Sequence, residues 1–161
     1  MISAKIAASA CILALLAACT AETEVPEISR GATSSEIYED SAFECLREAI
    51  YFEASATNET GQHAVADVIK NRKRDPRFPN TICGVVHDRC QFSYRCDGRP
   101  EVFADKIKYS NATEVAREAL EHPEVDVTKG AVYFHAARMA PGWFGTLLRT
   151  GNFGGNIFYK G

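Results

Sequence analysis

The clearest helical pattern in the chain runs through its first apolar stripe. Phe43, Leu46 and Ile50 are spaced by three and four residues, which places them on one face of a helix that ends near Ala54. The segment Ser41–Glu44 has the Ser-x-x-Glu form of a capping box, in which the two side chains bond the free amides of a helix start. The pattern therefore predicts a helix that begins at this box and ends at about residue 54.

The remaining apolar pattern predicts a mixed fold in which helices dominate. The expected elements are helices over 60–73, 82–86, 101–109 and 111–121, an extended segment over 90–98, and β-like runs at 131–135 and 157–159 around a glycine-rich piece. Thr81 is suited to cap the short helix. Trp143 is interpreted as a core residue, with stacking on a carbohydrate as the alternative. The expected class is therefore α+β, helix-dominated, in a single domain.

The amino-terminal residues form a pattern of their own. Lys5 precedes an apolar run, 6–18, that is too short to span a bilayer and ends in small residues, as an export signal does. Leu16-Ala17-Ala18-Cys19 resembles a bacterial lipobox, which predicts a lipoprotein signal peptide over 1–18 and a lipid anchor on Cys19. The alternative is a plain signal peptide in which this cysteine is incidental.

Charge divides the chain beyond the expected signal into two parts. Residues 20–42 carry six acidic residues and one basic residue, and their low apolar content predicts a flexible acidic tether over 19–42. Residues 43–161, the expected catalytic domain, carry 16 basic and 15 acidic residues. This balance lacks the basic excess that binding to nucleic acid phosphates requires, so no nucleic acid partner is expected.

Four cysteines fall within the expected domain: Cys45, Cys83, Cys90 and Cys96. In an exported domain of this size they indicate two disulfides, although the sequence alone does not choose the pairing. A structural zinc site is the competing interpretation, and the absence of close Cys-x-x-Cys pairs disfavours it. We therefore expect disulfides and no metal.

Glu53 continues the apolar stripe of the first helix. A carboxyl group on the core-facing side, in the last helical turn, meets partial desolvation and the negative end of the helix dipole, and both raise its pKa. A protonated carboxylic acid is what a general acid needs in order to donate to a poor leaving group such as a glycosidic oxygen. The alternative is a structural glutamate paired with a nearby arginine.

Several short motifs occur in an order that resembles a known family. They are Glu44-Cys45-Leu46, Tyr51-Phe52-Glu53-Ala54, Gly61-Gln62, Asn71-Arg72, Arg77-Phe78-Pro79, Cys83-Gly84-Val85-Val86, Cys90-Gln91-Phe92-Ser93, Cys96-Asp97-Gly98, Ala131-Val132-Tyr133-Phe134-His135 and Phe158-Tyr159. Over about residues 44–159 the chain resembles the SleB/CwlJ-type cell wall hydrolases. The resemblance implies a lysozyme-like domain, similar to lytic transglycosylases and goose-type lysozymes, that cleaves peptidoglycan.

The family's catalytic acid corresponds to Glu53. The resemblance further implies that two groups of side chains bind the glycan across a cleft: Gln91, Phe92 and Ser93 beside the acid, and Tyr133, Phe134 and His135 opposite. Many relatives carry a second acid four residues after the glutamate, where this chain has Thr57 after Ser55 and Ala56, and Asn156 replaces a frequent histidine.

The missing second acid favours one chemistry over another. Ordinary glycoside hydrolysis uses two carboxylates, and Glu59, the nearest candidate, is expected to point away from Glu53. We therefore expect a lytic transglycosylase without a cofactor, monomeric and anchored at the periplasmic face of the outer membrane. Alternatives are a muramidase, a zinc-dependent N-acetylmuramoyl-L-alanine amidase, and a non-catalytic lipoprotein that binds peptidoglycan.

Overall fold

The computed structural model describes residues 34–161. The expected signal peptide, Cys19 and most of the expected tether lie outside these residues. The elements, in chain order, are α1 (Ser34–Ala54), α2 (Glu59–Arg74), α3 (Ile82–Val86), the 3₁₀ helix η1 (Ser93–Cys96), α4 (Lys106–Glu121), β1 (Tyr133–Ala136), the 3₁₀ helix η2 (Gly142–Thr146), β2 (Leu148–Phe153) and β3 (Asn156–Lys160). The α+β, helix-dominated class expected from the sequence is confirmed.

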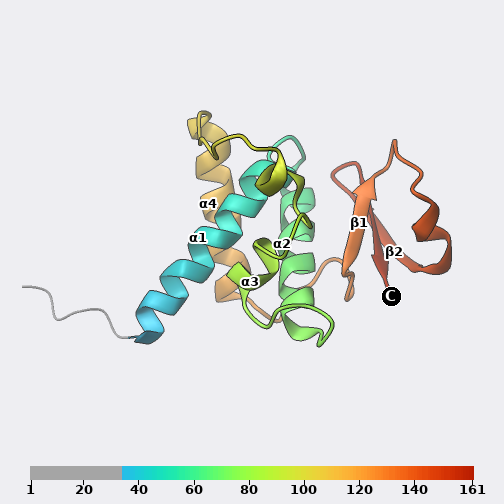
Figure 1. Cartoon of the computed structure of the whole chain (residues 1–161), viewed down its shortest axis with the longest axis horizontal. Helices are drawn as coiled ribbons and strands as arrows, with labels where there is room; N and C mark the ends of the chain where they lie inside the picture. Colours follow the sequence, from blue (N-terminus) through green and yellow to red (C-terminus); the bar gives the residue numbers. More distant parts are fainter. Residues whose placement is uncertain (1–33) are drawn as a thin grey trace, which may run out of the picture. The chain divides into compact units, whose positions relative to one another are not determined.

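Helix α1 is the centre of the helical part and contacts α2, α3 and α4 (Figure 1). Leu46, Ala49 and Ile50 are fully buried, so the apolar stripe read from the sequence is the face that packs on the other helices.

The helix begins at Ser34, seven residues before the expected capping box. The expected start at Ser41 is therefore wrong, and the end of the acidic segment, 34–42, is helical where we expected a flexible tether. Acidic residues near the amino end of a helix are favoured by its dipole, which explains why this composition is compatible with helix.

Helix α2 agrees with its expected bounds to within one residue at each end. Asn58 caps it by accepting a hydrogen bond from the Gly61 N–H at 3.0 Å, and most of its length is buried between α1 and the sheet (Figure 1). Thr81 caps α3 as expected, through the N–H of Gly84 at 2.9 Å.

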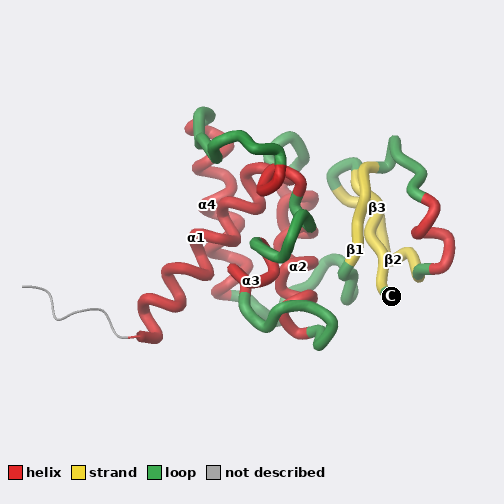
Figure 2. The backbone as a smooth tube through the Cα atoms, in the orientation of Figure 1, coloured by secondary structure: helices red, strands yellow, loops and turns green. Residues whose placement is uncertain are grey.

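Two segments between α3 and α4 differ from the sequence prediction. The extended run expected over 90–98 contains η1, and the connection from α3 to α4 is otherwise mostly loop (Figure 2). The two helices expected over 101–121 are one helix, α4, which begins only at Lys106 because Asp105 caps it through the N–H groups of Ile107 and Lys108. Nothing between residues 109 and 111 breaks the helical pattern, so the helix continues to Glu121.

The carboxy-terminal part forms a three-stranded antiparallel sheet in the order β1-β3-β2. Tyr133 pairs with Tyr159 between β1 and β3, and β2 and β3 form a hairpin that turns at Gly154 and Gly155. Both glycines have positive φ values, +56° and +80°, which favour residues without a side chain. Phe158 of β3 is fully buried and anchors the sheet to the helical core.

Polar side chains on α2 hold the segment that leads into β1. The Asn71 amide donates to the carbonyl of Ala131 at 3.1 Å, and Arg72 Nε donates to the carbonyl of Val132 at 2.8 Å. Beside them on the same helix, the buried Lys70 ammonium donates to the carbonyl of Val125 at 2.7 Å. These bonds fix where β1 begins relative to α2, and therefore which side chains of β1 face the end of α1.

Candidate active site

Glu53 lies in the last turn of α1 and lines a cavity of about 740 Å³. Burial raises the pKa of its carboxyl group above the ordinary value of 4.5, while the backbone N–H of Ser93 and the charge of Arg72 act more weakly in the opposite direction. The expected direction of the shift is confirmed, with desolvation as its main cause. A carboxyl group in this state is suited to donate a proton at a higher pH than an exposed glutamate.

The alternative of a structural ion pair does not fit the contacts of Glu53. Arg72 attracts the carboxylate through space, but its Nε is committed to the carbonyl of Val132. Among the residues of the described range, none forms an ion pair with Glu53. The carboxyl group is therefore available to a ligand in the cavity.

The segment around η1 forms one wall beside Glu53. A disulfide joins Cys90 to Cys96 and closes a small loop, in which Gln91 and Ser93 are exposed and line the cavity. Ser93 is the first residue of η1, so its N–H has no partner within the helix and is free to donate to Glu53.

Phe92 does not line the cavity, in contrast to the expectation from the family resemblance. Its side chain is 1% exposed and packs in the hydrophobic core, with the Arg72 guanidinium 5.6 Å from its ring centroid. In a short loop the neighbours of an inward-facing residue face outward. Phe92 thus anchors the loop, and its neighbours are presented to the cavity.

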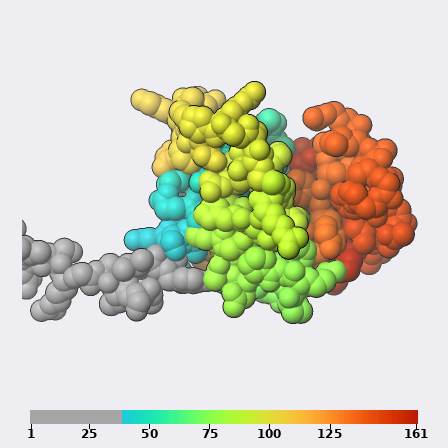
Figure 3. Space-filling view, viewed as in Figure 1, coloured from blue at the N-terminus to red at the C-terminus, as the bar shows by residue number. Residues whose placement is uncertain are grey.

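The opposite wall comes from β1 and the segment that follows it. All three residues expected there, Tyr133, Phe134 and His135, line the cavity with Glu53. His135 is held at both ring nitrogens, since Nε2 lies 3.0 Å from the Tyr159 hydroxyl and Nδ1 lies 2.9 Å from the carbonyl of Ala136. Figure 3 shows the two wall segments, residues around 90 in yellow-green and around 140 in orange, side by side on one face of the molecule.

Sequence reasoning missed part of this wall. Trp143, for which the sequence favoured a core position over sugar stacking, is 45% exposed and lines the cavity, with its ring centroid 6.0 Å from that of Tyr133. Met139, Thr146 and Leu147 line it as well. The connection between β1 and β2 has no helical or strand periodicity, so the sequence contained no signal that these residues face the same space as Glu53.

Arg72 is the other charged residue that sequence reasoning left out. It lies in the last turn of α2, is 4% exposed, and still contributes to the cavity lining. Burial lowers its pKa to about 10, so the guanidinium remains charged at neutral pH. The Asn71-Arg72 motif belongs to the family pattern, but its position at the end of a helix suggested no role.

The disulfides complete the framework around the site. Cys45 of α1 is bonded to Cys83 of α3, and Cys90 is bonded to Cys96. The structure therefore selects one of the three possible pairings, and none of the four cysteines is left for a structural zinc site.

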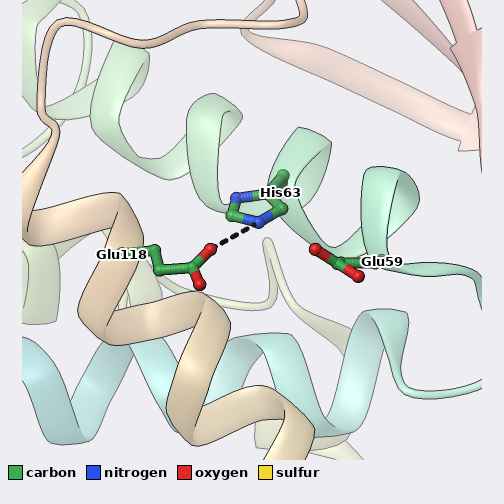
Figure 4. Close-up of side chains that lie close together, drawn as sticks. All are labelled: Glu59, His63 and Glu118. Carbon is green, nitrogen blue, oxygen red and sulfur yellow. Dashed lines mark ion pairs between the residues drawn. The ribbon is translucent and has the colours of Figure 1, made fainter.

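A cluster of possible metal ligands lies outside the cavity. His63 Nε2 is 3.2 Å from Glu118 Oε2, and a carboxylate oxygen of Glu59 lies within 4.8 Å of both (Figure 4). It is the only group of three or more such side chains that come this close within residues 34–161, and none of its members lines the Glu53 cavity. The three side chains line a separate pocket of about 230 Å³.

Comparisons with known proteins agree with this architecture. The solved catalytic domain of the Bacillus cereus SleB protein is 27% identical, with a TM-score of 0.65 over 81% of this chain and 99% of that chain. The catalytic domain of the germination-specific lytic transglycosylase SleB from Bacillus anthracis is 25% identical, with a TM-score of 0.62 over 83% of this chain and 100% of that chain. The expected lysozyme-like fold is confirmed.

Sequence relatives point to the same group. The spore cortex-lytic enzyme of Halalkalibacterium halodurans is 30% identical over 122 residues, which are 75% of this chain and 35% of that protein. The chain thus spans about a third of the length of that relative. Residues 56–159 match the family described as Cell Wall Hydrolase, in a span that begins just after Glu53. The chain therefore belongs to the cell wall hydrolase family, of the SleB type.

Proposed function

We propose that this chain is a lytic transglycosylase that cleaves the bond between N-acetylmuramic acid and N-acetylglucosamine in peptidoglycan, with Glu53 as its acid and base. One observation carries the proposal. Among the described residues that line the cavity, Glu53 is the only carboxylate. Glu59, the next acid after Glu53 in the chain, lines other pockets beside the first turn of α2. A hydrolase with two carboxylates flanking the bond lacks its second group here.

A single carboxyl group is sufficient for transglycosylation. Protonated Glu53 donates its proton to the glycosidic oxygen as the bond from that oxygen to the muramic acid C1 breaks. The resulting carboxylate then takes the proton from the 6-hydroxyl of the same muramic acid, whose oxygen bonds to C1 and closes a 1,6-anhydro ring. The proton returns to Glu53 and no water is consumed.

The surroundings of Glu53 suit both halves of this cycle. Burial favours the protonated form before cleavage, while the Ser93 N–H and the charge of Arg72 stabilise the carboxylate that forms afterwards. A group whose two protonation states are both supported in this way can alternate between acid and base.

The cavity walls are suited to a saccharide. Trp143 and Tyr133 offer ring faces on which the apolar faces of sugars stack, and Gln91 offers an amide beside them. His135, whose two ring nitrogens are already hydrogen-bonded, contributes its ring to the wall. We assign glycan binding to Gln91, Ser93, Tyr133, Phe134 and His135, with Trp143 added. Phe92 is left out of this set because it is buried.

We further propose that the protein acts outside the cytoplasm, where peptidoglycan lies, with Cys19 as its lipid anchor. The two disulfides support an oxidising compartment. No helix among residues 34–161 has the length and apolar character needed to cross a membrane.

The deciding experiment is product analysis. The full chain is incubated with purified sacculi, and the released muropeptides are identified by mass spectrometry. Transglycosylation yields 1,6-anhydromuramic acid ends. Reducing muramic acid ends would indicate a muramidase, release of free stem peptides that a chelator abolishes would indicate an amidase, and the absence of turnover would indicate a binding lipoprotein.

A further inference from the structure

The side chain of Arg72 is buried in an unusual way for an arginine. It is 4% exposed and lies between aromatic rings, with its Cζ 5.3 Å from the centroid of Phe78 and 5.6 Å from that of Phe92. Removing a charged group from water is costly unless it is paired, and no carboxylate within the described residues forms an ion pair with it. The position therefore needs an explanation beyond packing.

Most of the hydrogen-bonding capacity of this guanidinium is unused. Its Nε donates to the carbonyl of Val132 at 2.8 Å, whereas Nη1 is buried without a partner among residues 34–161. An arginine has five N–H donors, and a single bond to a backbone carbonyl would require only one of them. Leaving a buried donor unpaired is unfavourable. A smaller donor could bind the carbonyl of Val132 without this cost, so the remaining donors of the guanidinium require a role of their own.

The charge of Arg72 is directed at the cavity. The side chain lines the cavity together with Glu53 and Tyr133, which stand on opposite walls, and its charge is attracted by the carboxylates of Asp88 and Glu53. An acceptor group bound between these walls would meet a desolvated, positively charged donor, which is where charge-assisted hydrogen bonds are strongest.

We propose that Arg72 binds a carbonyl or carboxylate oxygen of the glycan at the site of cleavage. This inference rests on the proposed function of the cavity and adds a substrate-binding residue to it. Two groups of the substrate carry such oxygens: the acetamido group on C2 of each sugar, and the lactyl group on each muramic acid. Either one would supply the acceptor that the protein itself does not provide.

The test measures binding of three tetrasaccharides to the full chain carrying Glu53→Gln, which prevents turnover. Alternating N-acetylglucosamine and N-acetylmuramic acid carries both groups, chitotetraose carries only the acetamido group, and cellotetraose carries neither. The affinity for each saccharide is measured on this chain, on the same chain with Arg72→Lys added, and on the same chain with Arg74→Lys added as the matched control. Arg74 lies on the same helix but is exposed and donates to the carbonyl of Pro123 at 2.5 Å.

We expect Arg72→Lys to weaken binding of the alternating tetrasaccharide about 10-fold or more, as loss of a charge-assisted hydrogen bond does, and Arg74→Lys to leave it unchanged. If chitotetraose loses the same factor, the acetamido group is the acceptor, and if it loses none, the lactyl group is. Cellotetraose binding should not depend on Arg72. Equal losses on all three probes, or no loss on any, would overturn the proposal.

Two further readouts separate a failed fold and a failed mechanism from a failed proposal. If thermal unfolding shows that Arg72→Lys does not fold, the affinities of the three tetrasaccharides are compared on protein that retains Arg72. An affinity that falls about 10-fold from the alternating tetrasaccharide to chitotetraose, or from chitotetraose to cellotetraose, supports the proposal. Equal affinity for all three overturns it. Cleavage of sacculi by Glu53→Gln would disprove the proposed role of Glu53, whereas the Arg72 comparison would still stand.

Discussion

Gly61 and Gly154 are packed backbone to backbone, so the turn of the β2–β3 hairpin rests directly on the first turn of α2. A Cβ atom on Gly61 would lie 2.7 Å from the Cα of Gly154, and one on Gly154 would lie 2.8 Å from the Cα of Gly61. Thr57, which stands where relatives often carry a second acid, fills the space beside both glycines. This contact helps to fix the sheet, and with it the wall that faces Glu53, against the helices.

We expect Gly61→Ala to destabilise the protein. In an ordinary helix this change gains up to about 1 kcal/mol, but here the added methyl meets the Gly154 backbone, and overpacking of this kind costs about 1–3 kcal/mol. Thermal unfolding of the full chain measures the effect. Gly142→Ala is the control, because nothing lies within 4 Å of the added atom. Equal melting temperatures for the two variants would contradict the assigned contact.

Glu53→Gln should lower the rate of sacculus digestion by about 10²- to 10⁴-fold, because general acid–base catalysis contributes that much. Glu59→Gln is its matched control and should retain full activity, since Glu59 lies outside the cavity. Both rates are measured from the release of soluble muropeptides. Comparable losses in the two variants would instead indicate a mechanism with two carboxylates.

The stability of the same Glu53→Gln variant should depend on pH in a defined direction. The pKa of Glu53 is raised in the folded protein, so the native state binds this proton more tightly than the unfolded chain. The resulting stabilisation is fully present below the unfolded pKa and is lost as pH rises through the folded pKa. Glu53→Gln removes this loss, and its melting temperature relative to the wild type should therefore be higher at pH 7 than at pH 4. Glu59→Gln controls for the removal of one carboxylate charge. If the melting temperature of Glu53→Gln relative to the wild type stays constant with pH, the raised pKa of Glu53 is refuted.

The two disulfides should differ in what they support. Removal of Cys45–Cys83, with a sequence separation of 38, is expected to cost about 4 kcal/mol of stability from loop entropy, and removal of Cys90–Cys96, with a separation of 6, about 2 kcal/mol. The second bond holds Gln91 and Ser93 at the cavity, so its loss should reduce activity more. Paired Cys→Ser variants, compared by melting temperature and muropeptide release, check both. If activity follows stability alone, the small loop has no part in positioning the site.

The sequence predicted those parts of the site that depend on a helical face. Leu46, Ile50 and Glu53 share one stripe, and because the apolar members must be buried, the direction of the glutamate follows from them. The same reasoning failed at Ser41, since a capping box is a local pattern that also fits the interior of a helix. It failed for Phe92 because a short loop has no period from which an inward-facing residue can be recognised.

Local spacing therefore determined most of the elements, the position of Glu53 on the buried face of α1, and the four cysteines available for two disulfides. Only the tertiary structure decided which cysteines pair, that Trp143 and Arg72 stand at the cavity, and that Glu53 is the sole carboxylate among its described lining residues. At the cavity, Glu53 of α1 is 19 positions from Arg72 of α2 and 90 positions from Trp143 of η2. Such proximity is created by helix–helix and helix–sheet packing, and no periodicity within a single segment encodes it.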